Sequence, residues 1–200
     1  MRRIQQGMFF LCSMAMLLSA VFASTPGRYH VNQKNILANA PGLSAETLRY
    51  AVKGFDWANR NHEVRKPNIL TVVDFTLPSF KKRLWVINLK TGKTLIHAYT
   101  TQGKASGLVY ARHFSNQFKS DQSSLGVYKI TGEYVGEHGP SLHLLGLEKG
   151  INNNAEKRAI VIHSAWYATP EFVARYHRTG RSWGCFAIDP KIRQRFIQLT

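Results

Sequence analysis

The clearest helical pattern in the chain lies between Ser44 and Asn61. Apolar residues recur there at intervals of three and four, which places them on one face of a helix. They are Leu48, Ala51, Val52, Phe55 and Ala58. Ser44 is a suitable N-cap, because its hydroxyl can accept a hydrogen bond from an unpaired backbone N–H of the first turn. The pattern predicts one amphipathic helix that ends near Asn61.

Beyond Pro67 the pattern changes to short runs of β-branched and aromatic residues, which are typical of strands. The runs cover residues 69–77, 83–89, 94–100, 127–130, 141–147 and 159–163. Thr91 and Gly92 separate the second run from the third and predict a β-hairpin. Two short helices are expected over residues 171–177 and 191–199, because each follows a proline and proline fits the first turn of a helix.

These elements predict an α+β fold that is predominantly β, with short helices and an N-terminal helix. A chain of 200 residues is long enough for one domain. Residues 24–39 are polar and show no periodicity, so we expect an arm or linker over 24–43. The single domain is then expected over 44–200, with its core at about 70–190.

The first residues have the layout of a secretory signal. Arg2 and Arg3 precede an uncharged apolar run over residues 7–23, and small residues stand before Ser24. An uncleaved membrane anchor is the alternative, but the run is shorter than the roughly 20 residues that span a bilayer. We expect residues 1–23 to be removed and the chain to be exported to the periplasm or cell envelope.

The chain is strongly basic, with 27 Lys and Arg against 11 Asp and Glu. Loss of the two arginines of the signal would lower the formal charge from +16 to +14. A hydrophobic content of 44% excludes disorder as the reason for the charge. The basic residues are scattered, so we expect no nucleic-acid partner and favour anionic envelope polymers or peripheral association with a membrane surface. We expect a monomer.

The chain has two cysteines, Cys12 and Cys185. Cys12 lies in the predicted signal, so the exported chain keeps one thiol and cannot form an internal disulfide. Cys185 is then buried and inert, paired between chains, or used in chemistry.

A histidine and this cysteine both stand at positions where catalytic side chains are often displayed, a strand end and a tight turn. His163 ends an apolar strand, and Cys185 ends the segment Gly-Arg-Ser-Trp-Gly-Cys. A nearby histidine can take the thiol proton and return it to a leaving amine. Gly184 leaves room for a substrate carbonyl, and backbone N–H groups of the turn can hold an oxyanion. On spacing alone, a buried Cys185 and a structural His163 explain the pattern equally well.

The stretch from Ser124 to Cys185 resembles the L,D-transpeptidase catalytic domain, and within it the branch known as the murein L,D-transpeptidase catalytic domain family. The family pattern is a histidine, an interval, and then Ser/Thr-His-Gly-Cys. Here Ser182, Gly184 and Cys185 match that pattern, and Trp183 stands where the broad family has histidine. Asparagine and proline of related sequences are replaced by Ala187 and Phe186. The resemblance spans residues 70–188 and implies a β-sandwich or barrel catalytic domain.

The resemblance implies a role for each matching residue. Cys185 is the nucleophile, His163 is the base and acid, and the backbone carbonyl of Ser164 orients the imidazole. The backbone N–H groups of Gly184 and Cys185 form the oxyanion hole. The implied substrate-binding residues are Ser182, which also shapes the turn, together with Arg181, Trp183, Tyr134 and His138.

The implied activity is that of a cysteine acyltransferase acting on peptidoglycan stem peptides. The Cys185 thiolate attacks the carbonyl of the third stem residue, expels D-alanine and forms a thioester. The acceptor is a stem amine, a protein lysine or water, and with water the enzyme is an L,D-carboxypeptidase. A non-catalytic cell-wall-binding protein of the same fold is the alternative from another class. No metal or organic cofactor is expected.

Other histidines have simpler interpretations. His138 and His143 flank Gly139 and Pro140, and they predict a turn followed by a strand rather than a metal site. His177 is a rival base, but the arginines around it favour a solvated helix face.

Overall fold

The computed structural model describes residues 31–200, and the predicted signal lies outside them. Within this range there are three sheets. One is antiparallel, with the order β1 (Ile69–Val73), β2 (Leu84–Asn88) and β3 (Thr94–Ala98). A second has the order β5 (Tyr128–Gly136), β6 (Gly139–Gly146), β7 (Val161–Ser164) and β9 (Phe186–Ile188). The third pairs β4 (Gln102–Gly103) with β8 (Arg181–Ser182) in parallel.

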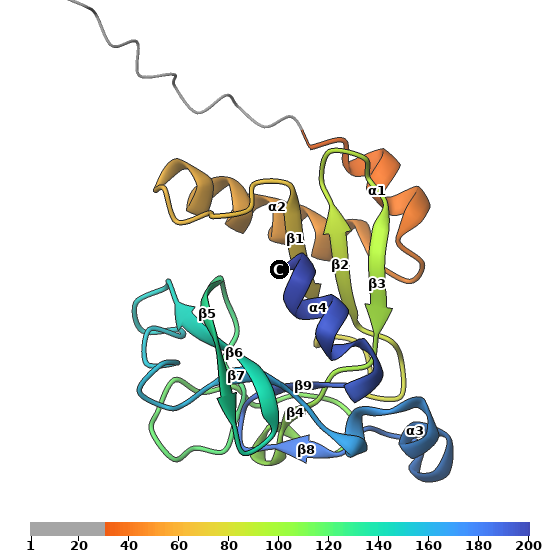
Figure 1. Ribbon diagram of the computed structural model, residues 1–200, viewed down its shortest axis with the longest axis vertical. Helices are drawn as coiled ribbons and strands as arrows, with labels where there is room; N and C mark the ends of the chain where they lie inside the picture. Colours follow the sequence, from red (N-terminus) through yellow and green to blue (C-terminus); the bar gives the residue numbers. More distant parts are fainter. Residues whose placement is uncertain (1–30) are drawn as a thin grey trace, which may run out of the picture.

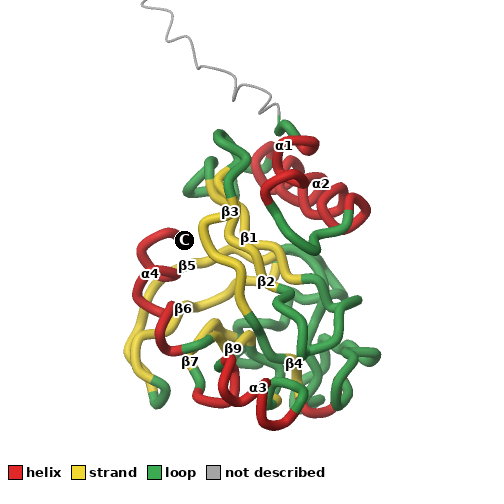
Figure 2. The backbone as a smooth tube through the Cα atoms, turned by 90° about the vertical axis from the view of Figure 1, so that its right-hand side faces the viewer, coloured by secondary structure: helices red, strands yellow, loops and turns green. Residues whose placement is uncertain are grey.

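Helices lie at the two ends of the molecule, and one further helix crosses the middle of the view (Figure 1). Helices α1 (Gln33–Asn39) and α2 (Ala45–Arg60) lie together beside the three-stranded sheet. Helix α3 (Pro170–Tyr176) lies near β8, and α4 (Arg193–Leu199) ends the chain. The view in Figure 2 shows the same separation of α1 and α2 from the four-stranded sheet. Among residues 31–200, no helix is long and apolar enough to span a membrane.

The three-stranded sheet is buried on both faces. Trp85 and Ile87 of β2 pack with α1 and α2, whereas Leu84 and Val86 pack on the other face, toward the four-stranded sheet. Two buried faces explain why β2 is a continuous apolar run rather than an alternating one. This sheet therefore separates the two hydrophobic cores.

Most of the predicted elements are confirmed. Helix α2 begins after Ser44, whose Oγ accepts a hydrogen bond from the Thr47 N–H at 3.0 Å. Strands β2 and β3 form the predicted hairpin, and α3 and α4 follow the expected prolines. His138 lies in the turn between β5 and β6, as expected.

The arm or linker expected over residues 24–43 is wrong for residues 33–39. Helix α1 forms there, with Asn32 as its N-cap, and Ile36 is fully buried against the core around Trp85. A helix of seven residues contains too few turns to show a period in the sequence, and it is stabilised by tertiary packing. The domain boundaries stay predictions.

The expected predominance of strands is also wrong, because helix and strand content are roughly equal and no closed barrel is present in the described residues. Strands β1, β2, β3 and β7 are shorter than the runs that predicted them, whereas β5 and β6 are longer. Strand β1 ends at Val73, since the Asp74 side chain accepts a hydrogen bond from the Thr76 N–H and turns the chain. The fold is α+β with three separate sheets.

Candidate functional site

The two faces of the four-stranded sheet differ in chemistry. Ile162 and Phe186 face the hydrophobic core. Strands β7 and β9 are parallel, with His163 opposite Ala187. Cys185 directly precedes β9 and is two residues from Ala187, so its side chain leaves the sheet on the same face as that of His163. The parallel register thus brings the predicted histidine and cysteine to one face, away from the core.

His163 is held in one tautomer. It is buried, and its Nδ1 lies 3.1 Å from the backbone carbonyl of Ser164. A carbonyl oxygen only accepts hydrogen bonds, so Nδ1 carries the proton and the lone pair of a neutral ring is on Nε2. Burial lowers the pKa of His163 from its ordinary value of 6.5, and the nearby His138 lowers it further. The imidazole is therefore a neutral base at pH 7.

The hairpin between β5 and β6 covers this imidazole. His138 is exposed, and its ring stacks on that of His163 with centroids 4.3 Å apart. The backbone carbonyl of His138 accepts a hydrogen bond from Ser164 Oγ at 3.4 Å, and Arg193 of α4 donates to the same Oγ at 3.2 Å. The β5–β6 hairpin and helix α4 thus both hold the segment that carries His163.

Cys185 is a half-buried free thiol. Its Sγ donates to the backbone carbonyl of Ala159 at 3.4 Å and accepts a hydrogen bond from the Val161 N–H. Burial raises the pKa of the thiol above 9.0, against the opposing effects of the Val161 N–H and the Arg158 charge. Within residues 31–200, no hydrogen bond joins Cys185 to His163. The thiol is thus protonated at neutral pH and turned toward Ala159.

The turn before the cysteine is organised by Ser182. This residue is buried, and its Oγ donates to the Cys185 carbonyl at 2.7 Å and accepts from the Gly184 N–H at 3.1 Å. Of the two expected oxyanion-hole donors, Gly184 is therefore already used. The Cys185 N–H donates to no residue in the part of the chain that the structure describes. Ser182 is thus buried and hydrogen-bonded within the turn itself.

The structure gives a different reason for glycine at position 184 from the one that we expected. Its φ is +126°, and a Cβ at this position would lie 2.8 Å from both the Gln122 carbonyl oxygen and Ile160 Cδ1. The absent side chain therefore makes room for the protein's own loop, not for a substrate carbonyl. A residue larger than glycine would push the turn away from that loop.

Two hydroxyl groups donate hydrogen bonds to the backbone of the Gly184–Cys185 turn. Thr101 Oγ1 donates to the Cys185 carbonyl at 3.3 Å, and Ser123 Oγ donates to that of Gly184 at 3.0 Å. Thr101 is held in place by the adjacent Thr100, whose carbonyl accepts two hydrogen bonds from the fully buried guanidinium of Arg83. The carbonyls of Gly184 and Cys185 are thus both bound by hydroxyl groups of other segments.

The other predicted substrate residues lie around the turn and the hairpin. Trp183 is 69% exposed, and the Lys104 ammonium lies 3.4 Å from its ring centroid. Arg181 is exposed and donates to the Lys104 carbonyl at 2.9 Å. Tyr134 stacks on His143 with centroids 4.1 Å apart. The structure thus joins His138 to His163, and it places Tyr134 in a separate ring pair.

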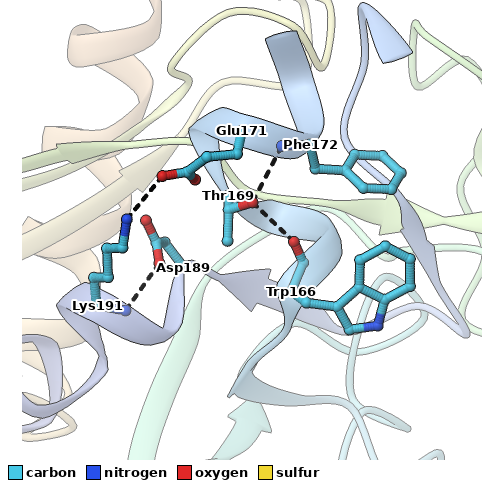
Figure 3. A network of polar contacts seen from close by, with 6 residues as sticks. All are labelled: Trp166, Thr169, Glu171, Phe172, Asp189 and Lys191. Atoms are coloured by element: carbon cyan, nitrogen blue, oxygen red, sulfur yellow. Dashed lines mark hydrogen bonds and ion pairs between the residues drawn. The ribbon is translucent and has the colours of Figure 1, made fainter. Parts of the chain in front are cut away.

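A polar network ties the two strand exits together (Figure 3). After β7, Thr169 caps α3 by accepting from the Phe172 N–H and donates to the Trp166 carbonyl. After β9, Asp189 accepts from the Lys191 N–H, and Lys191 Nζ pairs with Glu171 of α3 at 2.7 Å. The ion pair between Lys191 and Glu171 therefore connects the segment after His163 to the segment after Cys185.

Two residues near Cys185 were missed from the sequence. Arg158 and Tyr167 both lie close enough for their charged forms to interact electrostatically with Cys185. Neither belongs to a motif, and no local pattern marks them. His177, the rival base, is exposed at the C-cap of α3. Within residues 31–200, no group of three or more His, Cys, Asp and Glu side chains could hold a metal ion.

Comparison with known proteins gives a match to one family. The sequence model of one protein family, the L,D-transpeptidase catalytic domain, matches residues 39–200, which is most of the chain. No curated protein and no solved structure matches it. The domain family acts on peptidoglycan stem peptides. The chain therefore belongs to the L,D-transpeptidase catalytic domain family.

Proposed function

We propose that the chain is a peptidoglycan L,D-transpeptidase in which Cys185 is the nucleophile and His163 the general base. The substrate is a tetrapeptide stem, and the acylated residue is the third one, typically diaminopimelate. D-alanine leaves, and the acyl group passes through a thioester on Cys185 to an amine. We also propose that the protein works after export, in the periplasm or cell envelope.

The hydrogen bond between His163 Nδ1 and the Ser164 carbonyl carries this proposal. It directs the basic nitrogen, Nε2, away from the backbone of its own strand and leaves it free to accept a proton. The lowered pKa keeps this nitrogen unprotonated at neutral pH. A purely structural histidine does not require a fixed tautomer. It also does not require a place on the sheet face that carries the thiol.

Acylation needs one rotation within the site. The thiol leaves its contact with Ala159 and turns toward His163, which is a change of the Cys185 χ1 angle. Hydrogen bonds of catalytic groups are often incomplete in free enzymes and form when substrate binds. His163 pairs with Ala187 of the neighbouring parallel strand, two residues beyond Cys185, and the proposal requires that this rotation bring Sγ within hydrogen-bond distance of Nε2.

The first half of the reaction then balances as follows. Nε2 takes the thiol proton while Sγ bonds to the carbonyl carbon of the third stem residue. The resulting oxyanion accepts a hydrogen bond from the Cys185 N–H, the free donor of the turn. The C–N bond to D-alanine breaks, and the leaving nitrogen receives the proton from His163. A thioester and free D-alanine are the products.

In the second half, an amine of a neighbouring stem attacks the thioester. Nε2 removes a proton from the attacking nitrogen, the C–S bond breaks, and the proton returns to the Cys185 sulfur. The product is a 3–3 crosslink. A protein lysine as acceptor gives an anchored protein, and water gives carboxypeptidase activity by the same residues.

The test is an assay with a disaccharide-tetrapeptide, in which free D-alanine and crosslinked dimer are measured by mass spectrometry. We expect Cys185→Ala and His163→Ala each to lower D-alanine release at least about 1,000-fold. His177→Ala is the matched control, because this exposed histidine is the rival base, and it should retain wild-type activity. Dimer identifies a transpeptidase, whereas tripeptide alone identifies a carboxypeptidase.

Acylation by a carbapenem gives a second readout. Intact mass should show an adduct on wild-type protein and none on Cys185→Ala. If wild type and Cys185→Ala release equally little D-alanine, the catalytic proposal is wrong and the cell-wall-binding alternative replaces it.

A further inference from the structure

A loop over residues 115–124 folds around a single arginine, Arg158. The loop is closed by a hydrogen bond from the Ser115 N–H to the Ser123 carbonyl at 3.0 Å. Arg158 Nη1 donates to the Ser115 carbonyl and to Ser124 Oγ, each at 2.6 Å. Its Nη2 donates to Ser120 Oγ at 3.1 Å and to the carbonyl of Gln122. Both terminal nitrogens of the guanidinium thus bind this loop.

The same loop lies directly against the turn that carries Cys185. Gln122 O and Arg158 Nη2 would lie 2.8 and 3.4 Å from a Cβ on Gly184. Ser123 Oγ donates to the Gly184 carbonyl. Arg158 therefore connects the segment before β7 to the loop, and the loop connects it to the residue that precedes the nucleophile.

The charge of Arg158 is not neutralised by a carboxylate. All four of its hydrogen bonds go to neutral oxygens, and no ion pair includes it in the described part of the chain. The nearest acidic residue of the loop, Asp121, pairs with Lys104 at 3.2 Å. Less water screens a half-buried cation, and the charge of Arg158 acts on Tyr128, Cys185 and Asp121. The Cys185 sulfur lies in the field of this charge.

We propose that Arg158 is a positioning residue for the reaction: it holds the 115–124 loop against the Gly184–Cys185 turn, and its unpaired charge favours the thiolate of Cys185. This inference rests on the proposed function, in which Cys185 is the nucleophile. Among the other titratable groups, Tyr167 of the 3₁₀ turn after β7 interacts with Cys185, and His163 lies on β7 beside the strand that follows Cys185. Tyr128 and Asp121 interact with Arg158. Lys104 and Asp121 neutralise each other beside Trp183.

The test measures the reactivity of the Cys185 thiol and does not depend on enzymatic turnover. The rate of iodoacetamide alkylation is followed between pH 6 and 10 by mass spectrometry of the peptide that contains Cys185. At pH 7.5, Arg158→Gln should react about tenfold more slowly than wild type, with its midpoint moved to higher pH. Arg158→Lys keeps the charge and should stay within about threefold of wild type. Arg65→Gln, an exposed arginine that donates to the Thr131 carbonyl, is the control and should leave the profile unchanged.

Thermal unfolding of the same variants separates the charge from the fold. A merely structural arginine would lower the melting temperature in Arg158→Gln and leave the alkylation midpoint of the folded protein at its wild-type value, which would overturn the proposal. If Arg158→Gln does not fold, Ser120→Asp replaces it, because a carboxylate at this position pairs with Arg158 Nη2. Ser120→Asn is its neutral counterpart, and equal profiles for the two variants would also refute the role of the charge.

Failure of this proposal is distinct from failure of the proposed function. Alkylation reports on the thiol whether or not D-alanine is released. A shifted profile in an inactive chain would leave Arg158 as the counter-charge of Cys185 and remove only the enzymatic role.

Discussion

A single hydrogen bond sets the chemistry of His163. Because the Ser164 carbonyl can only accept, it selects the tautomer in which Nε2 is basic. The Cys185 sulfur has the complementary property: burial raises its pKa, so the group is a thiol at neutral pH. The pair is therefore neutral at rest, and we expect catalysis by general-base transfer rather than by a preformed thiolate–imidazolium pair.

The stacked ring of His138 offers a test at the scale of the residue. Burial is the largest cause of the lowered pKa of His163, and the charge of His138 adds to it. Since protonated imidazole is inactive as a base, we expect activity to fall only below pH 6.5, where His163 begins to bind a proton. In His138→Ala, the midpoint of this acid limb should rise, because the imidazole becomes more exposed and loses a like-charged neighbour.

His138→Phe is the matched variant, since it keeps a stacked ring and removes only the charge. It should raise the midpoint less than His138→Ala does. NMR titration of the His163 ring proton measures the same equilibrium without substrate. An unchanged titration in both variants would show that the stack has no influence on the base.

At the scale of the element, α1 shows how packing can replace sequence pattern. The helix is only seven residues long, yet Ile36 is fully buried with Trp85 and Leu48 in the core beneath α1 and α2. Short helices are marginal in water, so α1 owes its existence to this contact. The region expected as an arm is thus partly a structural component.

Ile36→Ala tests this role. If α1 is docked, the loss of a buried aliphatic side chain should lower the free energy of unfolding by about 2 to 5 kcal/mol. Urea denaturation followed by circular dichroism measures the change. Lys34→Ala, an exposed position of the same helix, should alter stability by less than about 0.5 kcal/mol. Equal stability of Ile36→Ala and wild type would mean that α1 is not part of the folded unit.

At the scale of the whole molecule, Arg83 links the two halves. It is fully buried at the start of β2, and its guanidinium donates to the Leu77 carbonyl, the Thr100 carbonyl and Gln102 Oε1. Burial lowers its pKa to about 9, and the nearby Asp74 partly opposes this. The residues that it holds lead directly to Thr101 beneath Cys185, so the hairpin sheet supports the candidate site.

Arg83→Met should therefore be among the most damaging substitutions outside the site. It leaves three buried acceptors without donors, and we expect a loss of roughly 3 to 5 kcal/mol of unfolding free energy. Arg83→Lys should also destabilise, because one ammonium cannot reach all three. Thermal and urea unfolding measure the effect, with exposed Arg112→Met as the comparison. A stable Arg83→Met would show that these acceptors find other partners.

Local sequence patterns were sufficient to predict the elements that are stabilised by residues close together in the chain. The cap at Ser44, the apolar face of α2 and the turn at Gly92 each depend on residues a few positions apart. The motif around Cys185 was also visible, because its pattern spans a few residues of one turn. His163 and its Ser164 carbonyl are neighbours in the chain, so a family resemblance was enough to predict their contact.

Tertiary structure alone decided the rest, because the partners lie far apart in the chain. Arg158 meets the 115–124 loop, Arg83 meets Thr100, and Ile36 meets Trp85. Gly184 is glycine because that loop lies beside it. No periodicity encodes such contacts, since each depends on how separate elements pack. The residues proposed for the chemistry could be identified along the chain, whereas those that hold the Cys185 turn in place became visible only in the folded protein.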